Sequence, residues 1–150
     1  MIQRIQSFYL LLAFLLGLIS LFLPWVTYLQ GDMILAFKTF SSEQTSMGGM
    51  LTSILVALFS ALALIIVGSF KKRARQMWLI KLAMVLAVLV LIGFAFDHYQ
   101  NIQALKLNGE LDMNYGLPVI FPPASLILLW LAYRGVKKDE DLIKSVDRLR

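Results

Sequence analysis

The sequence predicts an all-α membrane protein: a bundle of four transmembrane helices, a small β-sheet outside the membrane, and an amphipathic helix at the C-terminal end. Of the 150 residues, 59% are hydrophobic and 15% are charged. A soluble domain of this length could not shield so much apolar surface from water. Four segments are long enough to cross a hydrocarbon core of about 30 Å, which takes roughly 20 apolar residues per helix. They begin at Ser7, Met47, Met77 and Asn114.

The basic residues predict that both chain ends lie in the cytoplasm. Of the 14 Lys and Arg residues, only Lys38 and Lys106 fall on the other side of the four spans. Lys and Arg accumulate in cytoplasmic loops, so the side with the other twelve is the cytoplasmic one. We expect a membrane domain over residues 1–135, with outer loops at 30–46 and 98–115, and a tail helix over residues 136–150. The net charge of +5 reflects this topology, and no nucleic-acid partner is expected.

Both outer loops carry the signals of β-hairpins. Gln30-Gly31-Asp32 separates two runs rich in aromatic and β-branched residues. Asn108-Gly109 suits a type I′ turn. Apolar residues alternate on both sides of that turn with the period of a strand, at Leu105, Leu107, Leu111 and Met113. Because an isolated hairpin is marginally stable, we expect the two to pair into one sheet on the outer helix ends. The alternative is a pair of irregular loops.

The fourth span is interrupted by prolines. A helix from Pro122 to Tyr133 would rise only about 18 Å, so residues 117–121 are expected to complete the crossing as a kinked or extended segment. A recess beside Pro118, Pro122 and Pro123 is then a candidate site for a lipid or another apolar molecule. In the simpler alternative, Pro122 lies in the first helical turn and the helix continues into the tail, with Arg134 reaching towards the headgroups.

Groups that could perform chemistry are few. Asp97 and His98 close the third span, but neighbours on a helix point about 100° apart and cannot both face one ligand while the helix continues. The chain has one histidine and no cysteine, which leaves little for a metal beyond carboxylates. It also lacks a Ser-His-Asp arrangement, a Gly-rich phosphate loop and an HExxH motif. We therefore expect no catalytic site, no cofactor and no bound metal.

A basic cluster connects the second and third spans, from Lys71 to Arg75. It could recruit anionic lipid, at about 1 kcal/mol per charge near the surface. Fixing the topology is the simpler role.

The last residues predict a docking helix. Leu142, Ile143, Val146 and Leu149 would share one stripe of a helix, beside Arg148 and Arg150. A helix that lies on a membrane surface would carry aromatic residues and a mostly basic face, whereas this segment is aliphatic and of mixed charge. We therefore expect a protein partner that accepts the helix in a groove. The alternative is a helix that folds back onto the basic loop.

The two chain ends, "MIQRIQSFYLLLA" and "KKDEDLIKSVDRLR", resemble a family of small four-span membrane proteins of the Bacteroidetes type, known as a domain of unknown function. The resemblance implies a bacterial inner-membrane protein and supplies no activity or ligand. The layout is also similar to claudin-type four-span proteins, although their Gly-Leu-Trp and paired-Cys signature is missing.

Together these patterns predict a non-catalytic accessory or scaffold subunit of the inner membrane, surrounded by membrane lipids, that docks a protein partner through its tail. Binding or transport of a lipid or small apolar molecule at the fourth span is the alternative.

Overall fold

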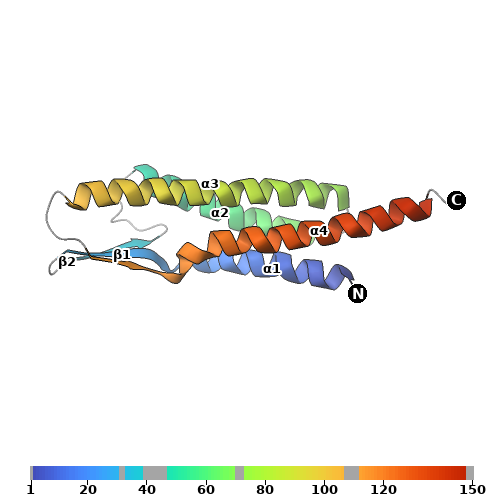
Figure 1. Cartoon of the computed structure of the whole chain (residues 1–150), viewed down its shortest axis with the longest axis horizontal. Helices are drawn as coiled ribbons and strands as arrows, with labels where there is room; N and C mark the ends of the chain where they lie inside the picture. The colour runs from blue at the N-terminus through green and yellow to red at the C-terminus, as the bar shows by residue number, and fades with distance from the viewer. Residues whose placement is uncertain (1, 31–32, 39–46, 70–72, 107–111, 148–150) are drawn as a thin grey trace.

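The computed structural model describes residues 2–30, 33–38, 47–69, 73–106 and 112–147. These residues form a mostly helical, elongated molecule (Figure 1). Its elements, in order, are α1 (Ile2–Ser20), β1 (Pro24–Gln30), β2 (Met33–Lys38), α2 (Met47–Gly68), α3 (Arg73–Lys106), β3 (Asp112–Tyr115), the 3₁₀ helix η1 (Leu117–Ile120) and α4 (Phe121–Asp147).

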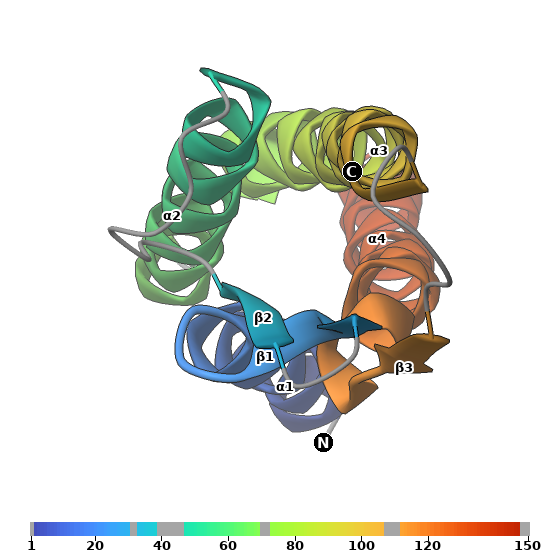
Figure 2. The same ribbon diagram turned by 90° about the vertical axis from the view of Figure 1, so that its left-hand side faces the viewer.

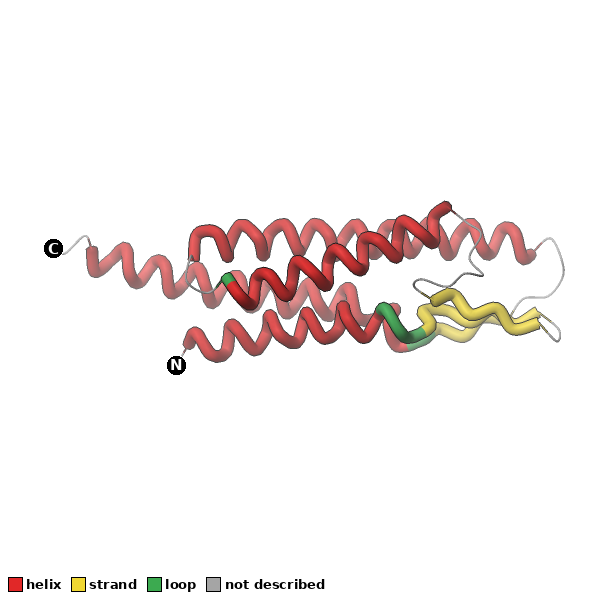
Figure 3. Tube along the Cα trace, turned by 180° about the vertical axis from the view of Figure 1, so that it is seen from behind, coloured by secondary structure: helices red, strands yellow, loops and turns green. Residues whose placement is uncertain are grey.

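The four α-helices form a closed ring. α1 packs against α2, α2 against α3, α3 against α4, and α4 returns to α1 (Figure 2). Both chain termini lie at one end of the bundle and the strands at the other (Figures 1 and 3). We call these the terminal end and the sheet end.

Within the described part of the chain, three helices are long and apolar enough to cross a membrane, over Leu51–Gly68, Arg73–Leu105 and Leu117–Ile143. In α1 the apolar part, Ile5–Ser20, is shorter. Many large apolar side chains on the outer faces are exposed, as on a helix bundle surrounded by lipid. The chain is therefore a membrane protein.

Small residues let the helices approach closely. Ala13, Ala83 and Ala87 are buried in the bundle core. A Cβ atom on Gly17 would lie 2.7 Å from Ser60 Oγ, so α1 and α2 touch at this point. In a membrane the hydrophobic effect does not drive helices together, so association relies on close packing, which glycine and alanine allow.

The strands form one antiparallel sheet in the order β2-β1-β3. β1 pairs with β2 so that Gln30 lies opposite Met33, which confirms the first hairpin. β1 also pairs with β3, with Tyr28 opposite Met113. The prediction of a single sheet with strands from both loops is confirmed, but the described part of the second loop contributes one strand, β3, and not the expected hairpin.

Two predicted element boundaries are wrong. The first span was expected to continue through Leu29, but α1 ends at Ser20 and Pro24 begins β1, because proline cannot continue a helix and the residues after it favour a strand. Leu105 was expected in a strand, but α3 extends to Lys106, where Ile102 and Leu105 pack against the aromatic cluster under the sheet. The expected outer loop 98–115 therefore begins inside a helix. Leu107, Leu111 and the turn at residues 108–109 lie outside the described residues.

Both alternatives for the prolines of the fourth span occur in the structure, an irregular segment followed by a helix with prolines in its first turn. Residues 117–120 form η1 with Pro118 in its first turn, which is the expected irregular segment. α4 then begins at Phe121, with Pro122 and Pro123 in its first turn, where the missing N–H groups would have no helical partner. The helix continues without a break across residue 135 to Asp147. Val136, expected in the tail, is 1% exposed and belongs to the bundle core.

Candidate functional site

At the terminal end, side-chain hydrogen bonds join α4 to α1 and α3. Gln6 of α1 donates a hydrogen bond from Nε2 to Asp139 Oδ2 of α4, at 2.8 Å. Arg73, at the start of α3, donates from Nη1 to the Asp139 backbone carbonyl at 3.4 Å. Gly135 makes room for this contact, since a Cβ atom there would lie 2.7 Å from Gln6 Cγ. We call Gln6, Arg73, Gly135 and Asp139 the terminal clamp.

Beyond the terminal clamp, α4 projects past the other helices (Figure 1). The two described side chains of the predicted docking stripe are exposed there, Leu142 by 53% and Ile143 by 46%. The structure thus brings part of the tail onto the bundle and leaves the next turn uncovered by the described residues. The remaining predicted docking residues, Val146, Arg148, Leu149 and Arg150, lie outside what the structure describes of side chains.

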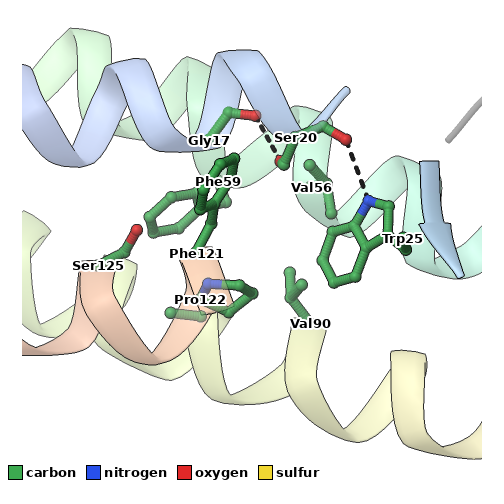
Figure 4. A pocket seen from close by; sticks show the side chains of 10 residues that line it. Gly17, Ser20, Trp25, Val56, Phe59, Val90, Phe121, Pro122 and Ser125 are labelled. Atoms are coloured by element: carbon green, nitrogen blue, oxygen red, sulfur yellow. Dashed lines mark hydrogen bonds between the residues drawn. The ribbon is translucent and has the colours of Figure 1, made fainter. Parts of the chain in front are cut away.

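The predicted recess at the prolines is a very small cavity. Figure 4 shows it between α1, α2, α3 and the first turn of α4, lined by Gly17, Trp25, Phe59, Pro122 and Ser125 among others. It leaves about 10 Å³ for the centre of a water molecule, which is room for one water at most. Pro118 is buried outside this lining and Pro123 is exposed. Of the three prolines only Pro122 lines this cavity, which is too small for a lipid.

Trp25 fixes the sheet to the bundle, a role that sequence reasoning missed. Its side chain is fully buried and donates from Nε1 to the Ser20 carbonyl at 3.0 Å, near the end of α1 (Figure 4). Its ring lies 5.0 Å from that of Phe94 on α3. A tryptophan directly after a helix-ending proline was the available signal, because a buried indole usually needs a hydrogen-bond acceptor.

Asp97 is buried between α2 and α3. It is 1% exposed, and its Oδ2 accepts a hydrogen bond from Thr52 Oγ1 at 2.6 Å. Its other oxygen, Oδ1, has no hydrogen-bond partner among the described residues. A buried polar atom without a partner is rare, and this carboxylate therefore depends strongly on Thr52.

His98 points away from Asp97, towards the sheet. Its Nδ1 lies 2.7 Å from the Tyr28 hydroxyl and its Nε2 lies 3.1 Å from the Tyr115 hydroxyl. A neutral imidazole donates at one nitrogen and accepts at the other, so it can satisfy both tyrosines. Phe94 stacks on the same ring at 5.8 Å. Burial raises the pKa of Tyr28 to about 12.

The expected divergence of Asp97 and His98 is therefore seen in the structure. One side chain bonds α2 and the other bonds β1 and β3. Neither side chain lines the cavity at Pro122 or the open surface along the end of α4. The two residues therefore have a structural role. Asp97 bonds α3 to α2, and His98 bonds α3 to the sheet.

Aromatic and basic side chains meet near the terminal end of α3 and α4. Lys81 Nζ lies 5.4 Å from the centre of the Tyr133 ring, and the Arg134 guanidinium lies 4.8 Å from that of Trp130. Such pairs are typical of the boundary between the hydrocarbon and the headgroups, where amphipathic side chains accumulate.

These features define a helical membrane protein whose bundle carries a three-stranded sheet at one end and a projecting helix at the other. A family described as a domain of unknown function, DUF4293, matches residues 2–149, and the chain belongs to this family. Comparison with curated proteins and with solved structures finds no match.

Proposed function

We propose that the protein is a non-catalytic accessory or scaffold subunit of a bacterial inner membrane, with four spans and both termini in the cytoplasm. In support of a fourth span, the 19 residues of α1 rise about 28 Å, close to the thickness of the hydrocarbon core. In support of the orientation, Arg73, Arg75, Arg134, Lys137 and Lys138 all belong to the terminal end of α3 and α4, and positive charge favours the cytoplasmic side.

We further propose that the end of α4 docks a protein partner. The observation that carries this proposal is the pair Leu142 and Ile143, exposed on a helix that is continuous with the bundle. The terminal clamp holds α4 against α1 and α3 immediately before them. A helix presented in a fixed direction loses little entropy when it binds, so a short aliphatic stripe can suffice.

The chemistry of the surface indicates the kind of partner. Leu142 and Ile143 are aliphatic, and Lys138 and Asp141, also exposed, give the segment both signs of charge. A bilayer surface would select aromatic residues and cations, so this pattern favours a cytoplasmic protein with an apolar, helix-accepting groove rimmed by charges of both signs.

The experiment is co-purification of the tagged full chain in mild detergent, with quantification of associated proteins. Leu142→Asp/Ile143→Asp should abolish the binding of a stoichiometric partner, because it places charge on the aliphatic stripe. Ser145→Asp is the matched control, because Ser145 is exposed on the same segment and the change adds charge without removing an apolar side chain.

A partner that the wild type and Ser145→Asp retain and the double variant loses would support docking. Equal recovery with all three proteins would refute it. Truncation should follow Glu140 and not Gly135, because removing Val136 and Asp139 would also damage the bundle.

A lipid site at the prolines is the weaker alternative. The cavity beside Pro122 has room for one water at most, far below the volume of an acyl chain.

A further inference from the structure

One face of α4 at the terminal end gathers cations. Arg134, Lys137 and Lys138 are exposed on successive turns and follow the exposed Trp130 at helical spacing. Tyr133, Asp141, Leu142 and Ser145 line the same open side of α4. This side of α4 thus carries three cations, Arg134, Lys137 and Lys138, and one carboxylate, Asp141, and we call the three cations the cationic face.

Two acidic residues of this segment, Asp139 and Glu140, are less exposed than the lysines beside them. The Asp139 carboxylate accepts the hydrogen bond of Gln6 in the terminal clamp. Asp139 and Glu140 are both half-buried, whereas Lys137 and Lys138 are exposed. The terminal clamp therefore engages the carboxylate of Asp139 on the bundle side, while Lys137 and Lys138 stay exposed.

The cationic face lies at the depth of phospholipid headgroups. Trp130 and the exposed Trp78 of α3 belong to the kind of aromatic belt found at a bilayer boundary. At 1.5 Å per residue, Lys137 and Lys138 lie about 10–12 Å beyond Trp130 along α4. The polar layer of one leaflet is roughly 5–8 Å deep beyond the hydrocarbon, so long lysine side chains on this turn reach it. Leu142 lies about 18 Å beyond Trp130, outside that layer.

We propose that the cationic face is a binding site for an anionic phospholipid of the surrounding bilayer. Arg134, Lys137 and Lys138 would hold the negatively charged headgroup, and Trp130 would contact the acyl chains below it. Arg134 already stacks on Trp130, which fixes a cation directly above the apolar part of the surface. A zwitterionic headgroup carries no net charge and gains less from this surface.

The test measures which lipid stays with the full-length protein. The chain is reconstituted into nanodiscs that contain equal amounts of phosphatidylglycerol and phosphatidylcholine, then extracted into mild detergent, and retained lipids are quantified by mass spectrometry. Wild type should be enriched in phosphatidylglycerol. Lys137→Gln/Lys138→Gln should reduce that enrichment at least about fivefold, the effect of one lysine near an anionic surface at low salt.

The matched control is Lys38→Gln/Lys106→Gln, which removes the same charge from residues near the sheet end. This control should retain the wild-type ratio of phosphatidylglycerol to phosphatidylcholine. Added salt should lower the phosphatidylglycerol enrichment of the wild type and of this control. The proposal is overturned if wild type retains the two lipids in bilayer proportion, if both double variants lose enrichment equally, or if Lys137→Gln/Lys138→Gln has no effect. None of these results depends on a protein partner at Leu142 and Ile143.

Discussion

Replacing Thr52 with valine would remove the hydrogen bond that holds Asp97 in the bundle. Valine has nearly the shape of threonine, so the change deletes the hydroxyl donor and leaves the packing of α2 against α3 in place. Asp97 is 1% exposed and its Oδ1 has no hydrogen-bond partner among the described residues. The carboxylate would then lose the 2.6 Å bond to Oδ2 as well.

Two magnitudes limit the expected cost. Hydrogen bonds between membrane helices contribute about 0.6 kcal/mol on average and about 1.7 at most. A hydrogen bond to a charged group contributes about 1.5–3 kcal/mol. A Cβ atom on Gly93 would lie 2.9 Å from Thr52 Oγ1, so α3 closes one side of the hydroxyl and restricts access for a replacing water. We therefore expect Thr52→Val to lower the free energy of unfolding by about 1.6 kcal/mol, where the two ranges meet.

The assay is equilibrium unfolding in mixed micelles, followed by tryptophan fluorescence. Thr52→Ser keeps the hydroxyl and should cost less than Thr52→Val. The double variant Thr52→Val/Asp97→Leu should recover much of the loss, because removing both partners leaves no buried group unpaired. Wild-type stability for Thr52→Val, or a double variant whose loss equals the sum of the two single losses, would refute the reasoning.

Two further predictions concern the joint between the sheet and the bundle. Gly116→Ala should destabilise the protein by about 1–3 kcal/mol, because the new Cβ atom would lie 2.1 Å from the Pro24 carbonyl oxygen, a backbone atom that cannot rotate away. Gly68→Ala, which meets nothing within 4 Å, is the control in the same unfolding assay. Tyr28 should make stability fall between about pH 10 and pH 12, because its pKa rises from 10.0 in the unfolded chain to about 12 in the fold and the unfolded state then releases the proton first. Comparing wild type with Tyr28→Phe by alkaline titration of stability isolates this contribution, and identical pH profiles for the two would contradict it.

Sequence patterns predicted the structural elements that are encoded by residues close together in the chain. The hairpin around Gln30 is encoded by two strand-forming runs on either side of a short turn, and it forms as expected. The second loop contained two patterns in competition. Asn108-Gly109 favoured a hairpin, but Phe94, His98, Ile102 and Leu105 recur at helical spacing, and all four contact the elements of the sheet joint. The helical spacing determined the structure up to Lys106, because burying that face of α3 under the sheet stabilises more than a short strand could.

Contacts between distant residues could not be predicted in this way. Gln6 and Asp139 are 133 positions apart, and no periodicity connects them. Thr52 and Asp97 belong to different spans, and a threonine in an apolar helix is too common to mark a partner for a carboxylate. Val136 was assigned to the tail because charged residues follow it, although its burial is decided by the neighbouring helices of the ring.

The terminal clamp also has a consequence for biosynthesis. The ring of helices closes only when α4 reaches α1, and the residues that meet there are made at opposite ends of translation. At about 5–20 residues per second, roughly 7 to 27 s separate the synthesis of Gln6 from that of Asp139. During that interval the face of α1 that later receives α4 has only lipid or the insertion machinery to cover it. A truncated product that lacks α4 would expose this face permanently, which gives membrane quality control a way to distinguish unfinished chains from complete ones.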